Sequence, residues 1–236
     1  MSEFWRKTTV RGQETVAVWR EYLPLMTVGG TGVDGFAAEL GSLGELAQVR
    51  DDRSADVEME KHRERAGYQA IRSLNLAVPK LIEGELADEH PLRELLGAIY
   101  ALVPQTNALN LKRARKLIPL WKKANAAVAA LNPGDAIVRG TTGVAEFTQM
   151  VVDFPPLSQA TSDAQMTLRA ARGELRTRSR QVDRMNKRIY LKLKSEARSD
   201  PALKAALLAQ VTRERTTRKR VVRSAVIPSD SLPQEV

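Results

Sequence analysis

The stretch QMTLRAARGELRTRSRQVDRMNKRIYLKLKSEA, residues 165–197, carries the clearest helical pattern of the chain. Leu168, Leu175, Val182 and Ile189 recur every seven positions, which places them on one face of an α-helix. Arginine and lysine crowd the remaining positions. The stretch therefore predicts a long amphipathic helix whose apolar stripe must be buried against other helices.

The same stripe occurs earlier in the chain, displaced by 111 residues. The matching apolar positions are Val57 with Leu168, Ile71 with Val182, Leu74 with Met185, Val78 with Ile189 and Ile82 with Leu193. The segment GGTGVDGF at 29–36 matches GTTGVAEF at 140–147 by the same displacement, with five of eight positions identical. These matches predict a duplicated helical hairpin, in which each copy has a short arm, a glycine-rich loop and a long arm.

The predicted fold class is all-α, because only 5% of the residues are aromatic and good helix formers dominate. A single hairpin cannot bury its stripe, so we expect the two copies to close into an antiparallel four-helix bundle with short accessory helices. The first repeat is placed at 1–104 and the second at 105–212, both in one bundle, with a basic and then polar tail at 213–236. The sequence leaves open whether the helix from Val33 to Glu85 is continuous, while Pro155 and Pro156 predict a break in the second copy.

The two loops share a further pattern at the entry to the long arm. Glycines are followed by Thr31 or Thr142 and then by Phe36 or Phe147. In this the chain resembles uncharacterised bacterial proteins built from tandem helical hairpins. The resemblance implies the bundle fold, and it implies no activity.

The sequence lacks the residue groups that catalysis and metal binding need. The absence of cysteine excludes disulfides, thiolate metal sites and cysteine nucleophiles. Neither His62 nor His90 has the glutamate three positions earlier that di-metal helix bundles use. The glycine-rich loops lack the Gly-Lys-Ser or Gly-Lys-Thr of a phosphate-binding loop and are expected to be turns. We therefore expect a protein that is not an enzyme, with no catalytic residue, no cofactor and no metal.

The positive charge is concentrated near the C-terminus. Residues 1–163 carry 19 Lys and Arg against 21 Asp and Glu, whereas residues 164–223 carry 18 against 5, a net of +13. This concentration of positive charge favours a partner of negative charge. The candidate polyanion-binding residues are Arg169, Arg172, Arg176, Arg180, Arg184, Lys187, Arg188, Arg213, Arg215, Arg218, Lys219, Arg220 and Arg223.

Two functions fit this distribution. The first is a non-catalytic structural or protein-interaction module that binds an acidic protein partner through its basic face. The alternative is sequence-independent nucleic-acid binding through the basic C-terminal quarter, where cations neutralise phosphates without a sequence motif. Basic residues beside an apolar stripe can equally form a solvated face, and no helix-turn-helix, zinc knuckle or aromatic stacking pattern accompanies them.

Two further expectations concern location and the helix seam. No run approaches the roughly 18 apolar residues of a membrane span, and Met1–Gly12 is followed by no apolar signal core, so a cytoplasmic protein is expected. Asn75 and Asn186 share one repeat position beside the stripe. They are expected either to pair and set the register of the helices or to be independent exposed amides.

Overall fold

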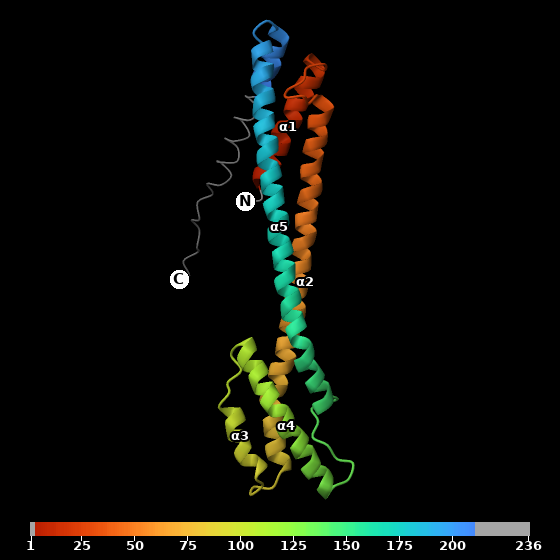
Figure 1. Ribbon diagram of the computed structural model, residues 1–236, viewed down its shortest axis with the longest axis vertical. Helices are drawn as coiled ribbons and strands as arrows, with labels where there is room; N and C mark the ends of the chain where they lie inside the picture. The colour runs from red at the N-terminus through yellow and green to blue at the C-terminus, as the bar shows by residue number, and fades with distance from the viewer. Residues whose placement is uncertain (1–2, 211–236) are drawn as a thin grey trace, which may run out of the picture. The chain divides into compact units, whose positions relative to one another are not determined.

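The computed structural model describes residues 3–210, and these residues are all-α, as predicted (Figure 1). The helices are α1 (Glu3–Tyr22), α2 (Val33–Glu85), α3 (Leu92–Tyr100), α4 (Asn107–Leu131) and α5 (Val144–Glu196), and residues 201–210 form a further helical segment. No strand occurs within residues 3–210. In the same range, no helix has an apolar stretch sufficient to span a bilayer.

The two long helices are unbroken, and each is 53 residues long. The helix from Val33 to Glu85 is therefore continuous, although Pro79 lies inside it. The predicted break at Pro155 and Pro156 is wrong, because α5 runs through both prolines. Each proline costs about 3 kcal/mol in a helix interior. Both are exposed, and the adjacent Phe154 is buried in a hydrophobic core, so packing beside the prolines holds the helix together.

A similar tight turn precedes each long helix. Val28 and Thr31 exchange backbone hydrogen bonds of 2.9 and 3.1 Å, and Arg139 and Thr142 exchange bonds of 3.0 and 3.1 Å. Gly29 and Gly140 have φ values of 60° and 62°, in the left-handed region that glycine tolerates best. The glycine-rich loops are therefore turns that lead into α2 and α5.

The described chain divides into two compact units, of which unit 1 is assembled from two distant segments and unit 2 is one continuous segment. Unit 1 contains the described residues up to Arg50 together with those from Ala171 onward, and unit 2 contains Asp51–Ala170. Each long helix thus begins in one unit and ends in the other. Each unit contains residues of both predicted repeats, so the division into units differs from the predicted division into repeats. The repeat boundaries and the single four-helix bundle stay predictions.

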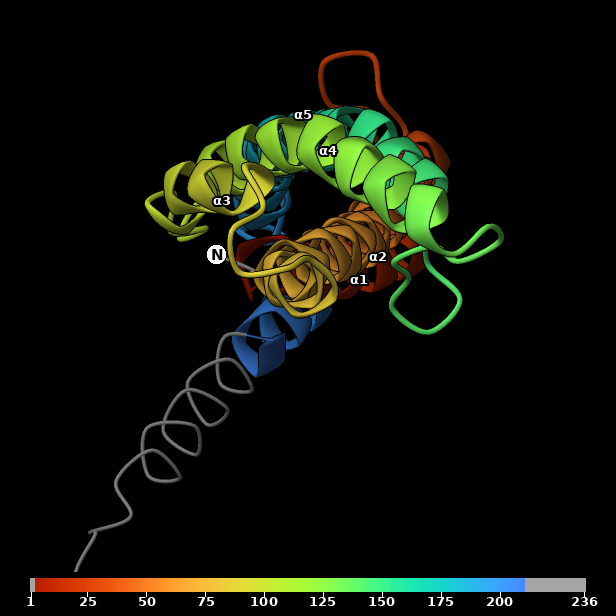
Figure 2. The same ribbon diagram turned by 90° about the horizontal axis from the view of Figure 1, so that it is seen from below.

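Unit 2 has one hydrophobic core to which four helices contribute. Trp121 of α4 and Phe147 of α5 are fully buried, with 5.8 Å between their ring centroids. The other core residues include Ile71, Val78 and Ile82 of α2, Leu96 and Ile99 of α3, and Leu117 and Leu120 of α4. Figure 2 shows α3 and α4 beside the end of α2 that carries these residues. Each such side chain contributes about 1.5–3 kcal/mol when it is fully buried.

Unit 1 has a comparable core. Trp19 of α1 and Phe36 of α2 are fully buried, with ring centroids 6.3 Å apart. From α5, Leu175, Val182 and Ile189 join this core, so the predicted stripe is the buried face of the helix in unit 1. Leu203 and Leu207 of the segment 201–210 complete the cluster.

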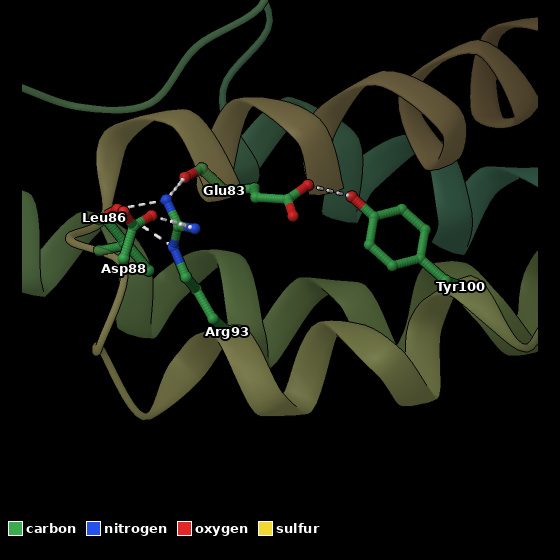
Figure 3. Close-up of polar contacts among 5 residues, drawn as sticks. All are labelled: Glu83, Leu86, Asp88, Arg93 and Tyr100. Atoms are coloured by element: carbon green, nitrogen blue, oxygen red, sulfur yellow. Dashed lines mark hydrogen bonds and ion pairs between the residues drawn. The ribbon is translucent and has the colours of Figure 1, made fainter.

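A side chain of α3 holds the C-terminus of α2 (Figure 3). The last carbonyl groups of a helix lack partners within it. Arg93 Nε and Nη2 donate to the carbonyl oxygen of Leu86 at 3.2 and 2.8 Å, and Nη2 also donates to that of Glu83. Arg93 pairs with Asp88 at 2.7 Å, and the Tyr100 hydroxyl donates to the Glu83 carboxylate at 2.9 Å. These contacts place a cation at the negative end of the α2 dipole and join α3 to α2.

Candidate functional site

The exposed side of α5 in unit 1 carries arginines at every fourth position. Arg172, Arg176, Arg180 and Arg184 are all exposed, and we call these four residues the arginine ridge. Positions four apart are neighbours on a helix surface, separated by about 6 Å along the axis. The ridge is therefore a continuous row of guanidinium groups on the part of α5 that buries Leu175, Val182 and Ile189 on another face.

The ridge arginines have no ion-pair partner within residues 3–210. Nearby ion pairs involve other cations of α5. Lys187 pairs with Asp183 at 2.7 Å, Lys192 pairs with Glu196 at 3.1 Å, and Arg178 pairs with Glu39. No carboxylate of the described residues thus neutralises the ridge directly.

The other predicted polyanion-binding residues are distributed differently. Lys187 and Arg188 are exposed on the same helix in unit 1, and Lys187 is held by its ion pair. Arg169 is exposed too, but it belongs to unit 2. The remaining six lie outside the described residues: Arg213, Arg215, Arg218, Lys219, Arg220 and Arg223.

A second basic element, which the sequence analysis missed, is α4 in unit 2. This helix has no Asp or Glu and six cations: Lys112, Arg113, Arg115, Lys116, Lys122 and Lys123. All are exposed except Arg113, which is buried. In the total for residues 1–163, acidic residues elsewhere cancel this local excess of positive charge, which is visible only over the length of one helix.

The basic face of α4 borders a groove that is shared with α3. The groove has a volume of about 340 Å³ and is lined by Leu95, Ala98, Ile99, Arg115, Lys116, Pro119, Leu120 and Lys123. Ile99 and Leu120 are only 3% and 5% exposed, whereas Leu95 is 50% exposed. The groove thus combines an apolar floor with a cationic edge.

A larger groove in unit 1, of about 660 Å³, runs between the early part of α2 and α5. Its lining is mixed: Ser42, Glu45, Leu46, Val49, Glu174, Thr177, Arg178 and Gln181. Its one arginine, Arg178, already pairs with Glu39 and donates to Gln181 Oε1 at 3.2 Å. This lining of mixed charge indicates no particular class of ligand.

A buried polar cluster joins α2 to α4 in unit 2. Asn75 Nδ2 donates to the backbone oxygen and the Oδ1 of Asn110, at 2.8 and 2.7 Å. Arg113 donates through Nε to the Asn75 carbonyl at 3.1 Å and through Nη1 to the Leu102 carbonyl at 2.7 Å. Burial lowers the pKa of Arg113, because it disfavours the charged form. The cluster is built chiefly from amides and carbonyls, which suits a structural role in setting helix register.

The expectation that Asn75 and Asn186 are independent exposed amides is wrong. Asn75 is fully buried and Asn186 is 8% exposed. The equivalent sequence positions therefore both face the interior of their units. The Oδ1 of each has no hydrogen-bond partner among the described residues, but Asn75 Nδ2 donates two hydrogen bonds, whereas the Asn186 side chain forms none with a described residue.

The described residues contain no group of three or more His, Asp or Glu side chains placed to hold a metal ion. His62 is exposed on α2, and His90 Nδ1 accepts from the Leu92 amide at 3.2 Å in the turn before α3. Shifted pKa values have local causes. The hydrogen bond and charge of Lys61 lower the pKa of Glu58, while burial and the bond to Glu83 raise the pKa of Tyr100. Neither Glu58 nor Tyr100 lines one of the two grooves described above.

Comparison with known proteins provides no relative from which a function could be transferred. No protein-family model, curated protein or solved structure matches the chain. The charged surfaces described above are therefore the features of residues 3–210 that bear on function.

Proposed function

We propose that this protein is a non-catalytic helical module that binds an acidic protein partner through the arginine ridge. The observation that carries this proposal is the row of four exposed arginines without a carboxylate partner within residues 3–210. The ridge is not needed for packing, since the buried stripe lies on another face of α5. Guanidinium groups bind carboxylates with two parallel hydrogen bonds, which gives both affinity and orientation.

The proposal includes a duplicated architecture, in which two helical hairpins contribute to an antiparallel four-helix arrangement. Several observations support it. The helices α2 and α5 have the same length and begin 111 residues apart, and each follows the same kind of turn. Each turn leads to a buried phenylalanine in contact with a tryptophan, Phe36 with Trp19 and Phe147 with Trp121. A cytoplasmic location is part of the proposal, since a chain without cysteine suits a reducing compartment.

An acidic protein is favoured over nucleic acid for the following reason. Residues 172–184, which carry the ridge, contain no aromatic side chain on which a base could stack. A nucleic acid therefore has only its phosphate backbone to offer the ridge. Nucleic-acid binding is the alternative, and the test below separates the two.

The test is a titration of the full chain with three fluorescent probes: a poly-glutamate chain, a DNA duplex and single-stranded RNA. Binding is measured by fluorescence anisotropy at about 0.15 M salt, where the screening length is near 8 Å. We expect poly-glutamate to bind more tightly than either nucleic acid. Replacing all four ridge arginines with glutamine should weaken its binding by roughly tenfold or more.

The matched control replaces the same four arginines with lysine. This variant keeps the charge and loses the planar donor fork, so its affinity should lie between those of the wild type and the glutamine variant. Unchanged poly-glutamate binding by the glutamine variant would overturn the proposal. Tighter binding of DNA or RNA, with a linear dependence of log affinity on log salt, would establish the alternative.

A further inference from the structure

We infer that the groove between α3 and α4 in unit 2 is a second interaction site, which takes an amphipathic helix with an acidic face from a partner protein. This site is separate from the arginine ridge in its residues and in its chemistry. The ridge offers charge alone, whereas the groove combines apolar surface with cations.

The floor and wall of the groove supply the apolar part. Leu95 is half exposed and Pro119 is exposed, although both line a concave surface above the buried Ile99 and Leu120. Covering such apolar surface yields about 25 cal/mol per Å² removed from water. A volume of about 340 Å³ can receive the side chains of one helix face, and helix-in-groove recognition uses residues spaced by three, four and seven positions.

The edge of the groove supplies the charge. Arg115, Lys116 and Lys123 line it, and none of them forms an ion pair with a described residue. The helix that carries them contains no carboxylate, and α3 contains only Glu94. A partner helix with glutamate or aspartate beside its apolar residues therefore complements both parts of the groove.

The walls of the groove are held in place before any partner binds. Arg93 and Tyr100 tie α3 to the end of α2 (Figure 3). The bonds among Asn75, Asn110 and Arg113 tie α4 to the same helix. A preformed site loses little conformational entropy on binding, which favours affinity.

Comparison with unit 1 indicates that packing does not require these cations. The comparison of the two helices rests on the proposed duplication. In it, α1 corresponds to α4, because Trp19 and Trp121 make equivalent ring contacts. Aligning these tryptophans places Glu14 at the position of Lys116 and Glu21 at that of Lys123. At these two positions the same packing role is thus filled by carboxylates, so Lys116 and Lys123 are cations of unit 2 that its packing does not require.

The recessed floor favours a helix over other anionic partners. Ile99 and Leu120 lie below the exposed cations, where a flat bilayer cannot reach them. Nucleic acid can contact the cations, but its backbone carries no apolar group to fill the groove. A protruding leucine or phenylalanine of a partner helix can reach the floor.

The test uses the full chain and a labelled synthetic helical peptide that carries leucines at spacings of four and three, flanked by glutamates. A control peptide has the same glutamates, with serine in place of leucine. Fluorescence anisotropy at about 0.15 M salt should show the serine peptide binding at least roughly tenfold more weakly. Phosphatidylserine vesicles and a DNA duplex are the other two probes, and both should bind more weakly than the leucine peptide.

Three variants locate the site. The charge reversal Lys116→Glu with Lys123→Glu should reduce leucine-peptide binding at least roughly tenfold, and Leu95→Ser should reduce it several-fold. The matched control, Lys80→Glu, changes an exposed cation of α2 in the same unit outside the groove and should leave binding unchanged. Circular dichroism and urea unfolding establish that each variant is folded.

The glutamine variant of the arginine ridge should bind the leucine peptide as the wild type does, so failure at one site is distinguishable from failure at the other. The inference is overturned if the folded protein does not bind the leucine peptide, or binds the serine peptide equally well. It is also overturned if the charge reversal has no effect, or if vesicles or DNA bind more tightly than the peptide.

Discussion

Arg113 is the only cation of α4 that lies in the core of unit 2, and the surrounding carbonyl groups explain how it is accommodated. A buried charge is costly unless hydrogen bonds replace its water. Two of its nitrogens donate to carbonyl oxygens, those of Asn75 and Leu102. Leu102 follows the C-terminus of α3, where the helix dipole is negative. The guanidinium is thus stabilised by dipoles, with no carboxylate among its hydrogen-bond partners.

The two equivalent asparagines should differ in their contribution to stability. Asn75→Ala removes two buried hydrogen bonds and takes this donor from the Oδ1 of Asn110, which costs about 1–3 kcal/mol. Asn186→Ala should cost less, since the Asn186 side chain forms no hydrogen bond with a described residue. Urea unfolding of the two variants measures the difference. Equal losses would mean that the hydrogen bonds of Asn75 contribute nothing beyond the packing of its side chain.

Arg93 should stabilise unit 2 by satisfying the end of α2. Arg93→Ala leaves the Leu86 and Glu83 carbonyls without this donor and removes the cation from the helix end, so the free energy of unfolding should fall by about 1–2 kcal/mol. Arg93→Lys keeps the charge and loses the forked geometry, and its loss should be smaller. Thermal and urea unfolding measure both variants. An alanine variant as stable as the wild type would contradict the capping role.

The Tyr100 hydroxyl should make stability depend on alkaline pH. Burial and the Glu83 carboxylate raise the pKa of Tyr100 and so favour the neutral phenol in the folded state. The stabilisation is present below the ordinary tyrosine pKa of about 10 and is lost as pH rises through the higher folded value. Tyr100→Phe lacks this loss, so the stability advantage of the wild type should shrink between about pH 8 and pH 11. A constant difference in urea unfolding over that range would contradict the expectation.

At the scale of the elements, α5 presents different chemistry on different faces. In unit 1, Val182 is 1% exposed within the core, while Arg180 two positions earlier is exposed on the ridge. The periodicity of the sequence sufficed to predict this division, because alternation between core and solvent is a local property of an amphipathic helix. The periodicity did not suffice to predict that α5 is continuous. The packing of Phe154 and its neighbours outweighs the intrinsic cost of Pro155 and Pro156 in a helix.

Substitutions on the two faces of α5 should have very different effects. Val182→Asp places an unpaired carboxylate in the core of unit 1 and should unfold that unit. Arg180→Ala changes an exposed side chain and should alter the free energy of unfolding by less than about 0.5 kcal/mol. Circular dichroism melting compares the two. Similar melting temperatures would contradict the assignment of buried and exposed faces.

At the scale of the whole molecule, unit 2 is inserted into unit 1 along the chain. Unit 1 combines the described residues up to Arg50 with those from Ala171 onward, and unit 2 is the continuous segment Asp51–Ala170 between them. Residues on both sides of the connection between α3 and α4 are therefore needed to build either unit.

A chain cut between Gln105 and Thr106 should remain one particle. A protease site inserted at this exposed point separates the predicted repeats without breaking a helix. The fragments should co-elute in native gel filtration, because each unit buries side chains from both, and should separate in concentrated urea. The uncleaved inserted chain is the control. Separate elution of folded fragments under native conditions would contradict this division into units.

The candidate surfaces were predictable from the sequence to different degrees. The arginine ridge follows from a local run of charge on a helix with a clear apolar stripe. The groove was not predictable, because it requires Leu95 and Ile99 of α3 to lie beside Pro119 and Leu120 of α4. The burial of Arg113 was not predictable either, since the nearby cations of α4 are exposed and its acceptors are supplied by α2 and by the segment after α3.

The sequence by itself determined the all-α class, the turns at Gly29 and Gly140 and the buried face of α5, because each depends on residues a few positions apart. The tertiary structure alone decided that the start of α2 shares a core with the end of α5, and the end of α2 with the start of α5. The physical reason is that the apolar stripes of both long helices are chemically alike, with Val, Ile and Leu at matching positions. Hydrophobic burial is non-directional, so the pairing of such stripes is settled by which side chains fit together in three dimensions.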